Sequence, residues 1–330
     1  MARRVPMTFA CAPYDRMQAL VTGQVEPEGI ALTYLAQPVE ETFWRQLRHE
    51  EFDASEISFS SFLIAKARGK PDLVAIPVFP SRAFRHGAIF VNVEAGIARP
   101  QDLVGKRVGV PEYQLTACLW VRGILEDEYG VRPEDIEWVT GGEERPDREE
   151  KLPVAPPGVR IRPLGAGQTL SHALLAGEID AVIAPRAPST LFHPSGRVRR
   201  LFERYEELEA AYWRRTGIFP IMHTVALKRA FYEQYPWAAQ NLYKACVEAK
   251  ARALAQLGST EALVTALPWQ VPAVEKTRAL MGEDWWPYGV EPNRKALETA
   301  IRYAVRQGLI PRAFGVEELF APNTLDHFVI

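Results

Sequence analysis

Residues 216–227 read Thr216-Gly217-Ile218-Phe219-Pro220-Ile221-Met222-His223-Thr224-Val225-Ala226-Leu227. From Ile218 onward this run is apolar enough for a central β-strand, although it stands far along the chain from the strands that open it. We therefore expect the chain to build a first α/β set, leave it for a second one, and return to the first through this segment. That return decides the fold, because it makes the first lobe discontinuous and the second an insertion.

On the N-terminal side of this segment, short apolar runs alternate with helical patterns. The runs that predict strands are Val5–Ala10, Ile30–Leu35, Ala54–Ser58, Leu73–Phe79, Ala88–Val93, Arg107–Val110, Ile136–Thr140, Val159–Leu164 and Ala181–Ala184. Apolar residues at helical spacing predict helices at 14–22, 39–51, 59–68, 115–129, 171–176, 237–257 and 295–308. This alternation predicts an α/β fold with mainly parallel sheets. The Glu-, Arg- and Pro-rich stretch 141–157 is expected to be an exposed loop.

The predicted lobes follow from where the two sets stop. The first set pauses near Pro80-Ser81-Arg82 and the second runs to about Gly217. We expect residues 1–82 and 218–330 to form one lobe, which includes the C-terminal helices, and residues 83–217 to form the inserted lobe.

Two crossovers would join these lobes, at Arg82–Arg85 and at Thr216–Pro220. We expect opening to hinge there. Two lobes joined in this way create an interlobe cleft, where small ligands commonly bind. The carboxyl ends of parallel strands and the N-termini of helices would face it.

Composition and charge exclude several classes of protein. The 330 residues are 47% hydrophobic and 24% charged, which is ordinary for a globular chain. The 39 basic and 41 acidic residues leave a net charge of −2, so no overall field favours nucleic acid or a membrane as a partner. No apolar run approaches the roughly 20 residues that span a bilayer. The sequence leaves the oligomeric state open, and a homo-oligomer is compatible with it.

The location is predicted from the N-terminus and the cysteines. No apolar run of signal-peptide length follows Arg3-Arg4. Cys11, Cys118 and Cys246 are odd in number, lie far apart and form no CxxC pair. This pattern is typical of cysteines that are buried as free thiols in a reducing compartment. We therefore expect a cytoplasmic protein.

Several stretches spread over nearly the whole chain carry a resemblance to a known family. They are Pro27-Glu28-Gly29-Ile30, Pro38-Val39-Glu40-Glu41-Thr42-Phe43, Phe52-Asp53-Ala54-Ser55-Glu56, Ile76-Pro77-Val78-Phe79-Pro80-Ser81-Arg82, Phe84-Arg85-His86, the run 105–117, the run 215–224 and Trp286-Pro287-Tyr288-Gly289. These stretches closely resemble 4,5-dihydroxyphthalate decarboxylase-like proteins. That family is similar in fold to type II periplasmic solute-binding proteins, with two α/β lobes around a cleft. The resemblance implies cytoplasmic decarboxylation of 4,5-dihydroxyphthalate to 3,4-dihydroxybenzoate, in the degradation of aromatic compounds.

The first cluster that suits this chemistry is Ser81-Arg82-Ala83-Phe84-Arg85-His86. An arginine fork matches a carboxylate at two points, and histidine is the side chain best suited to proton transfer near neutral pH. A solvated basic turn is the alternative interpretation. The position at a predicted crossover favours function.

A second cluster, Pro111-Glu112-Tyr113-Gln114-Leu115-Thr116, ends a strand and opens a helix. Free backbone N–H groups at that point favour an anion, and ordinary N-capping remains an equal alternative. The third cluster is Arg214-Arg215-Thr216-Gly217 with His223. Its arginines can simply complement a helix dipole, and a histidine in an apolar strand is more often a core residue than a catalyst. Glu40, Glu41 and Glu56 are further candidates.

The leading hypothesis is an aryl decarboxylase without an organic cofactor, in which a ring carbon takes a proton and CO2 then leaves. We expect His86 or His223 to be the acid. The substrate-binding residues are expected to be Arg82, Arg85 and Arg215 as carboxylate clamps, with Gln114 and Thr116 orienting the ring. A divalent metal on His86, His223 and a glutamate remains open on ligand type alone, although no spacing supports it. The alternative is a solute-binding protein that captures an aromatic or other small carboxylate without catalysis.

Overall fold

The chain divides into two compact units in the computed structural model, which describes residues 4–325. The first unit contains the described residues up to Arg82, the segment Ile221–Glu298 and the described residues from Phe314 on. The second unit contains Ala83–Pro220 and Thr299–Ala313. Each unit has its own β-sheet and is an α/β body.

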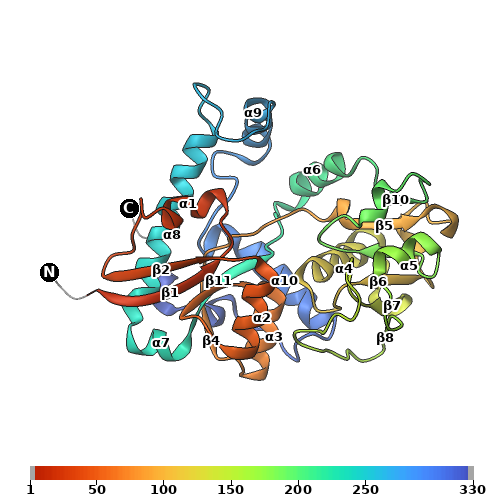
Figure 1. Ribbon diagram of the computed structural model, residues 1–330, viewed down its shortest axis with the longest axis horizontal. Coiled ribbons are helices and arrows are strands. Elements are labelled where there is room, and N and C mark those ends of the chain that lie inside the picture. Colours follow the sequence, from red (N-terminus) through yellow and green to blue (C-terminus); the bar gives the residue numbers. More distant parts are fainter. Residues whose placement is uncertain (1–3, 326–330) are drawn as a thin grey trace. The chain divides into compact units, whose positions relative to one another are not determined.

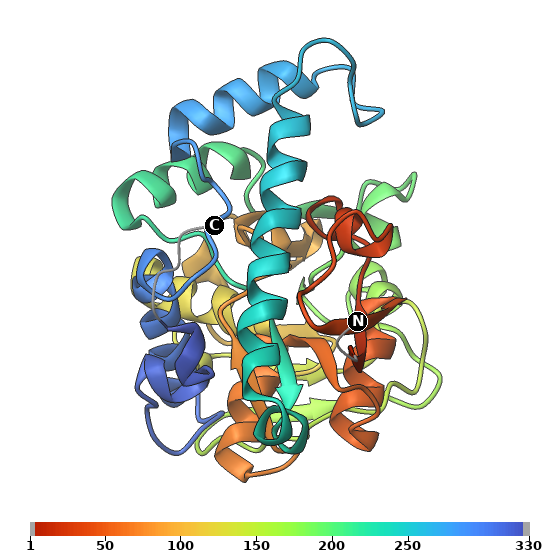
Figure 2. The same cartoon turned by 90° about the vertical axis from the view of Figure 1, so that its left-hand side faces the viewer.

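The first unit is built on a five-stranded sheet in the order β2-β1-β3-β11-β4 (Figure 1). Its strands are β1 (Val5–Cys11), β2 (Ile30–Ala36), β3 (Ala54–Ser58), β4 (Leu73–Ile76) and β11 (His223–Lys228). The helices of this unit are α1 (Gln18–Val21), α2 (Val39–His49), α3 (Phe59–Arg68), α7 (Arg229–Gln234), α8 (Pro236–Leu257) and α9 (Gln270–Met281). Figure 2 shows α8 as one long helix running past α1, with which it is in contact.

Strand β11 runs antiparallel to both of its neighbours, β3 and β4. Its first residue, His223, pairs with the last residue of β3, Ser58. The chain therefore re-enters the sheet at the carboxyl end of β3 and must run back along it. This direction places the start of β11 beside the edge where β1 and β3 end.

The second unit is built on a six-stranded sheet in the order β10-β5-β9-β6-β7-β8. Its strands are β5 (Ile89–Asn92), β6 (Arg107–Val110), β7 (Glu137–Thr140), β8 (Arg160–Pro163), β9 (Ala181–Ile183) and β10 (Val198–Arg200). Its helices are α4 (Thr116–Tyr129), α5 (Leu170–Ala176) and α6 (Tyr205–Thr216). Apolar side chains of α5 pack with Phe90, Val139 and Val182 of the sheet to form a buried core.

Both sheets are mixed, and parallel pairs, which were expected to predominate, have only a small majority. Five strand pairs in the described part of the chain are parallel and four are antiparallel. The antiparallel pairs all involve β11 or β5. These strands begin where the chain has just entered a unit, so neither follows the strand–helix–strand crossover that makes neighbours parallel.

Residues 299–313 pack with the second unit, although their place in the chain predicts that they belong to the first lobe. They include the second part of α10 (Arg294–Arg306). The Tyr303 ring lies over Gly123 of α4, where an added Cβ would stand 2.2 Å from the ring, and its hydroxyl donates to Asp127 at 2.7 Å. Arg302 also pairs with Asp127, at 2.6 Å. The spacing of apolar residues predicts that this helix buries one face. It does not predict which of the two units that face packs against.

None of the helices within residues 4–325 combines the length and the apolar character that crossing a membrane requires.

Candidate active site

The carboxylate of Glu56 lies fully buried on β3 and accepts hydrogen bonds from four donors. Its Oε1 accepts from the Tyr14 hydroxyl at 2.7 Å and from Nδ1 of His223 at 2.6 Å. Its Oε2 accepts from the backbone N–H of Ala12 at 3.1 Å and from the Cys11 thiol at 3.4 Å. An acceptor used in this way cannot also exchange protons freely with a ligand, so Glu56 is suited to orienting its neighbours.

Electrostatics keep this carboxylate charged. Burial raises the pKa of Glu56, but His223, the Ala12 N–H and the Tyr14 hydroxyl outweigh burial and hold it below its usual value. Burial, and then the Glu56 charge, raise the pKa of both the Cys11 thiol and the Tyr14 hydroxyl. Both groups therefore keep their protons and donate them to the carboxylate.

Strand register explains why these groups meet. In the antiparallel pair of β3 and β11, Glu56 is opposite Val225 and Ser58 is opposite His223. Glu56 and His223 are thus diagonal neighbours on one face of the sheet. Residues 12–14 follow β1, which is parallel to β3, so they leave the sheet at the same edge.

The His223 ring packs against an aromatic ring and remains partly accessible to a ligand. The ring of Phe43 meets it edge-to-face, with 4.8 Å between the ring centroids. The side chain is 16% exposed, and within the described residues Nε2 has no hydrogen-bond partner. Because Glu56 accepts from Nδ1, Nε2 is the nitrogen that can exchange a proton with a ligand.

Beside this group, the guanidinium of Arg16 contacts the faces of two aromatic rings. Its Cζ lies 4.1 Å from the centroid of the Tyr14 ring and 4.2 Å from that of Trp286. Nε donates to the carbonyl of Pro80 at 2.6 Å and Nη1 to Asp15 at 2.8 Å. Tyr14 thus contacts the arginine through its ring and Glu56 through its hydroxyl.

Arg82, a predicted carboxylate clamp, also lies in the first unit, where it is buried. Its Nη2 donates to the carbonyl of Pro287 at 3.2 Å and to the side-chain oxygen of Asn293. Burial lowers the pKa of Arg82 to about 9. Lys250 anchors the same segment through the Asp284 carboxylate at 2.8 Å. These contacts tie Arg82 to the 284–293 segment.

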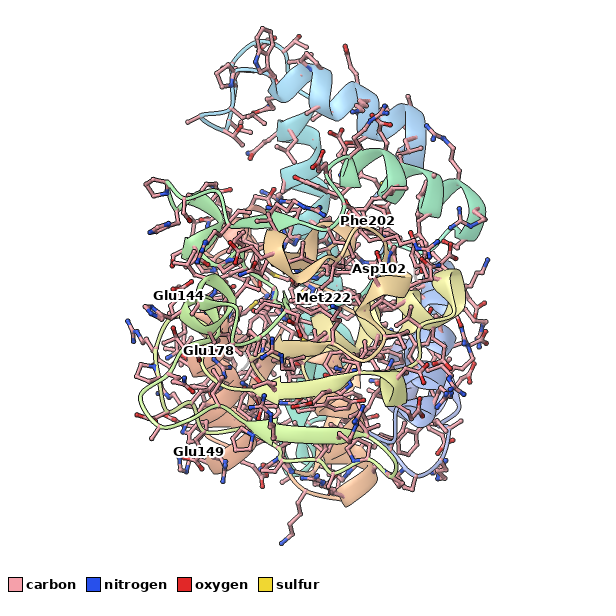
Figure 3. All side chains as sticks on the ribbon, turned by 90° about the vertical axis from the view of Figure 1, so that its right-hand side faces the viewer. Asp102, Glu144, Glu149, Glu178, Phe202 and Met222 are labelled. Carbon is pink, nitrogen blue, oxygen red and sulfur yellow. The ribbon has the colours of Figure 1, made fainter. Side chains whose placement is uncertain are left out.

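His86 lies in the second unit and is 3% exposed. Its ring contacts those of Tyr212, at 5.3 Å between centroids, and Phe202, at 6.0 Å; Phe202 is labelled in Figure 3. Burial, and then the charge of Arg215, lower the pKa of His86 to about 4. The imidazole is therefore neutral near pH 7.

This burial predicts a pH dependence of stability. Between about pH 6.5 and 4 the unfolded chain binds a proton at residue 86 that the folded chain does not, so stability falls as the pH drops. Replacing His86 with Phe should remove about 2–3 kcal/mol of that fall. Urea unfolding of both proteins between pH 7.5 and 4 measures it. The exposed His172→Gln variant should keep the wild-type slope, and a His86→Phe variant with that slope would contradict the prediction.

The other predicted binding residues all lie in the second unit, but they are not gathered on one ligand site by the contacts described. Arg85 donates to the carbonyl of Pro185 at 3.2 Å, and burial lowers its pKa to about 10. Thr116 is the buried first residue of α4. The Arg215 side chain is 54% exposed and pairs with Glu128.

Gln114 is buried and donates its amide to Glu112 at 2.7 Å. Glu112 also accepts from Arg148 at 2.7 Å and from Lys151. These partners hold the pKa of Glu112 below its usual value although burial raises it. The expectation that residues 141–157 form an exposed loop is therefore wrong for part of the stretch. The Lys151 side chain is only 4% exposed and forms an ion pair with the buried carboxylate of Glu112.

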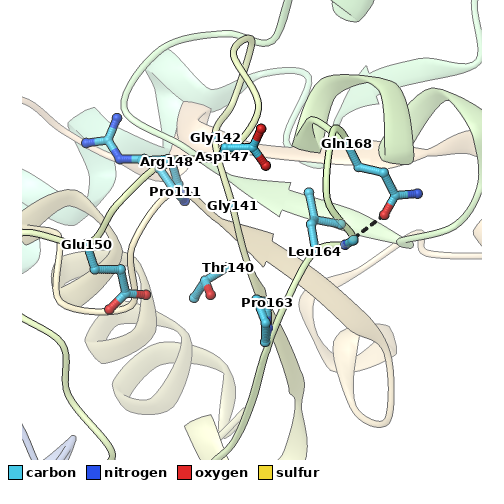
Figure 4. Close-up of a pocket in the computed structure, with 11 residues that line it drawn as sticks. Pro111, Thr140, Gly141, Gly142, Asp147, Arg148, Glu150, Pro163, Leu164 and Gln168 are labelled. Carbon is cyan, nitrogen blue, oxygen red and sulfur yellow. Dashed lines mark hydrogen bonds between the residues drawn. The ribbon is translucent and has the colours of Figure 1, made fainter.

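A pocket of about 360 Å³ lies in the second unit at the carboxyl ends of β7 and β8 (Figure 4). Thr140 and Pro163 line it from the strand ends, and Arg148 and Glu150 from the loop. Burial, and then the Glu112 charge, raise the pKa of Glu150. None of the predicted site residues lines this pocket, and it carries charges of both signs.

No cluster of three or more His, Cys, Asp or Glu side chains within residues 4–325 is arranged to hold a metal ion. Of the predicted catalytic and substrate-binding residues, the first unit contains His223 and Arg82, and the further candidates Glu40, Glu41 and Glu56 also lie there. His223 and Arg82 are close in the fold, because the His223 N–H donates to the carbonyl of Ser81 at 3.2 Å. Tyr14 and Arg16 were not predicted as site residues. The one feature of the sequence that could have indicated a site role for them is their position shortly after the carboxyl end of β1.

Comparison with known proteins gives two relatives, one of which matches over nearly the full length of the chain. The chain is 42% identical over 328 residues to a 4,5-dihydroxyphthalate decarboxylase of Comamonas testosteroni, and the match covers 99% of both chains. It is 44% identical over 194 residues to a 4,5-dihydroxyphthalate decarboxylase of Pseudomonas putida, which covers 58% of this chain and 75% of the relative. No protein-family model matches the chain.

Solved structures that are similar share the fold. The periplasmic aliphatic sulphonate binding protein SsuA of Escherichia coli is 15% identical with a TM-score of 0.54, covering 97% of this chain and 99% of that one. SsuA of Xanthomonas axonopodis pv. citri and the desulfurization enzyme DszB are each 15% identical, with TM-scores of 0.51 and 0.52, covering 98% of both chains. The predicted two-lobed α/β fold of the periplasmic-binding-protein type is confirmed.

Proposed function

The chain belongs to the 4,5-dihydroxyphthalate decarboxylase family, and on that premise we propose that it converts 4,5-dihydroxyphthalate to 3,4-dihydroxybenzoate and CO2. The observation that carries the proposal is the 42% identity over 99% of both chains. The enzyme is accordingly a carboxy-lyase of aromatic degradation.

The reaction needs a proton for the ring carbon and a binding site that orients the substrate. The hydroxyl para to the leaving carboxylate donates electron density into the ring, and the ring carbon that bears this carboxylate takes a proton. The bond to the carboxylate carbon then breaks, CO2 leaves, and its electron pair restores the aromatic ring. The protein must supply the acid and hold the carboxylate that is retained, because binding the leaving carboxylate tightly would stabilise the ground state.

We assign the acid to His223 rather than His86. Nε2 of His223 is reachable, and Glu56 fixes the ring through Nδ1 at 2.6 Å. His86 is enclosed by aromatic rings, and its lowered pKa of about 4 keeps it unprotonated near neutral pH. A group that carries no proton to give cannot serve as the general acid at that pH. Arg85, Gln114, Thr116 and Arg215 stay predictions as substrate ligands.

The test is turnover by the purified protein. Incubation with 4,5-dihydroxyphthalate should release CO2 and 3,4-dihydroxybenzoate in a 1:1 ratio, measured by gas analysis and chromatography, with and without a chelator to report any metal requirement. Phthalate, which lacks the hydroxyl groups, should not react. Tight binding of the dihydroxy acid without CO2 release would contradict the proposal and leave a binding protein of the same fold.

We also propose a cytoplasmic location. Cys11, Cys118 and Cys246 are buried free thiols, which supports a reducing compartment. Fractionation of cells that express the chain should recover its activity with cytoplasmic markers; recovery with periplasmic markers would contradict this.

A further inference from the structure

Two aromatic rings and two hydrogen-bond acceptors hold the guanidinium of Arg16 in place. The Cζ atom of Arg16 lies 4.1 Å from the centroid of the Tyr14 ring and 4.2 Å from that of the Trp286 ring. Contacts of this kind restrict the side chain and remove part of its hydration. A carboxylate meets an arginine fork in the plane of the guanidinium, through its N–H donors.

The guanidinium of Arg16 still has N–H donors for a ligand. A guanidinium has five N–H donors. Pro80 and Asp15 take one each, through Nε and Nη1, and among the described residues the others have no hydrogen-bond partner. The side chain is 14% exposed, so it is mostly desolvated and still reachable.

The arginine is joined to the proposed acid through one side chain. Tyr14 contacts Arg16 through its ring and donates its hydroxyl to Glu56 at 2.7 Å, and the same Oε1 accepts from His223 at 2.6 Å. A single tyrosine therefore sets the spacing between a cation and a proton donor. Other buried cations nearby serve the 284–293 segment: Arg82 binds Pro287 and Lys250 binds Asp284.

We propose that Arg16 is the substrate-binding residue that holds the retained carboxylate of the aromatic dicarboxylic acid, and that Tyr14 and Trp286 position it. The inference rests on the proposed function and adds the residue that selects the substrate. The two carboxylates of phthalates stand on neighbouring ring carbons. Fixing one of them therefore fixes the carbon that bears the other, which is where the proton must arrive.

The test compares three ligands in binding experiments, with no turnover needed: phthalate, the product 3,4-dihydroxybenzoate, and catechol, which has no carboxylate. Replacing Arg16 with Gln should weaken phthalate and 3,4-dihydroxybenzoate about 10–100-fold and leave catechol unchanged, because a charge-assisted pair is lost. Arg16→Lys, which keeps the charge and loses the planar fork, should lie between the two. Arg204→Gln, at an exposed arginine of the second unit, is the matched control and should bind like wild type.

The outcomes separate this inference from the proposed function. Unchanged binding of both acids in Arg16→Gln and Arg16→Lys overturns the inference, even if the wild type releases CO2. Weaker phthalate with unchanged 3,4-dihydroxybenzoate overturns it too, because Arg16 would then hold the leaving carboxylate. Arg16-dependent binding of both acids by a protein that never releases CO2 supports the carboxylate site and contradicts only the decarboxylase. Wild-type circular dichroism of the variants confirms that they fold.

Discussion

Replacing His223 with Ala is expected to lower kcat for CO2 release about 10²–10⁴-fold, the usual contribution of a general acid. The affinity for phthalate should change little, because a proton donor acts mainly in the transition state. The structural reason is that Glu56 takes Nδ1 and leaves Nε2 as the nitrogen that can protonate the ring. Steady-state rates with 4,5-dihydroxyphthalate and equilibrium binding of phthalate measure the two quantities separately.

The matched control is His86→Phe. This ring stands among Tyr212 and Phe202, and its Nδ1 has no hydrogen-bond partner among the described residues, so Phe fits the surroundings. Its kcat should remain within about threefold of wild type, since substitutions away from the chemistry have small effects. A His223→Ala enzyme of undiminished rate, or a His86→Phe enzyme that loses its rate, would contradict the assignment.

Most strands and helices were predictable because each buries an apolar run of suitable period. The bounds of β3, α3 and β6 agree with the predicted ones. Strand β11 was predicted from Ile218 but begins at His223. Pro220 explains the difference, because a residue without an N–H cannot donate to a central ladder.

Helix α9 (Gln270–Met281) was not predicted, and the reason is physical. Gln270 is its one buried residue, so no apolar stripe marks the helix in the sequence. Pairing direction was also beyond the sequence patterns. An apolar run predicts a buried strand and carries no information about whether its neighbour runs with it or against it.

The site depends on strand register, which the sequence does not contain. Glu40, Glu41 and Glu56 were equivalent candidates as sequence. In the structure Glu41 is exposed on α2 and pairs with Arg45, whereas Glu56 is buried against His223. A slip of one residue between β3 and β11 would have turned their side chains to opposite faces. In the sequence, Arg16 is one residue of a predicted helix and nothing marks it as a site residue. Its contact with Trp286, which is distant along the chain, exists only in the folded protein.

The second prediction with a large expected effect concerns Glu56. Replacing it with Ala should lower the free energy of unfolding by about 3–5 kcal/mol, because a buried charged partner is removed and the buried donors around it lose their acceptor. The nearly isosteric Glu56→Gln should fold better and lower kcat about 10–100-fold, as loss of an orienting partner commonly does. Its amide would place a donor against either His223 or the Ala12 N–H. Urea unfolding and steady-state rates measure the two effects.

The contribution of Glu56 to stability should also depend on pH. Because its folded pKa is below the usual value, Glu56 contributes stability that is fully present above the ordinary carboxyl pKa, about 4.3, and is lost as the pH falls through the folded value. The difference in unfolding free energy between wild type and Glu56→Gln should therefore shrink toward low pH. Glu41→Gln, at an exposed glutamate of α2, is the matched control and should lose neither stability nor rate. A Glu56→Gln enzyme with wild-type kcat would mean that the carboxylate does not orient His223, and the acid would then have to be sought elsewhere in the fold.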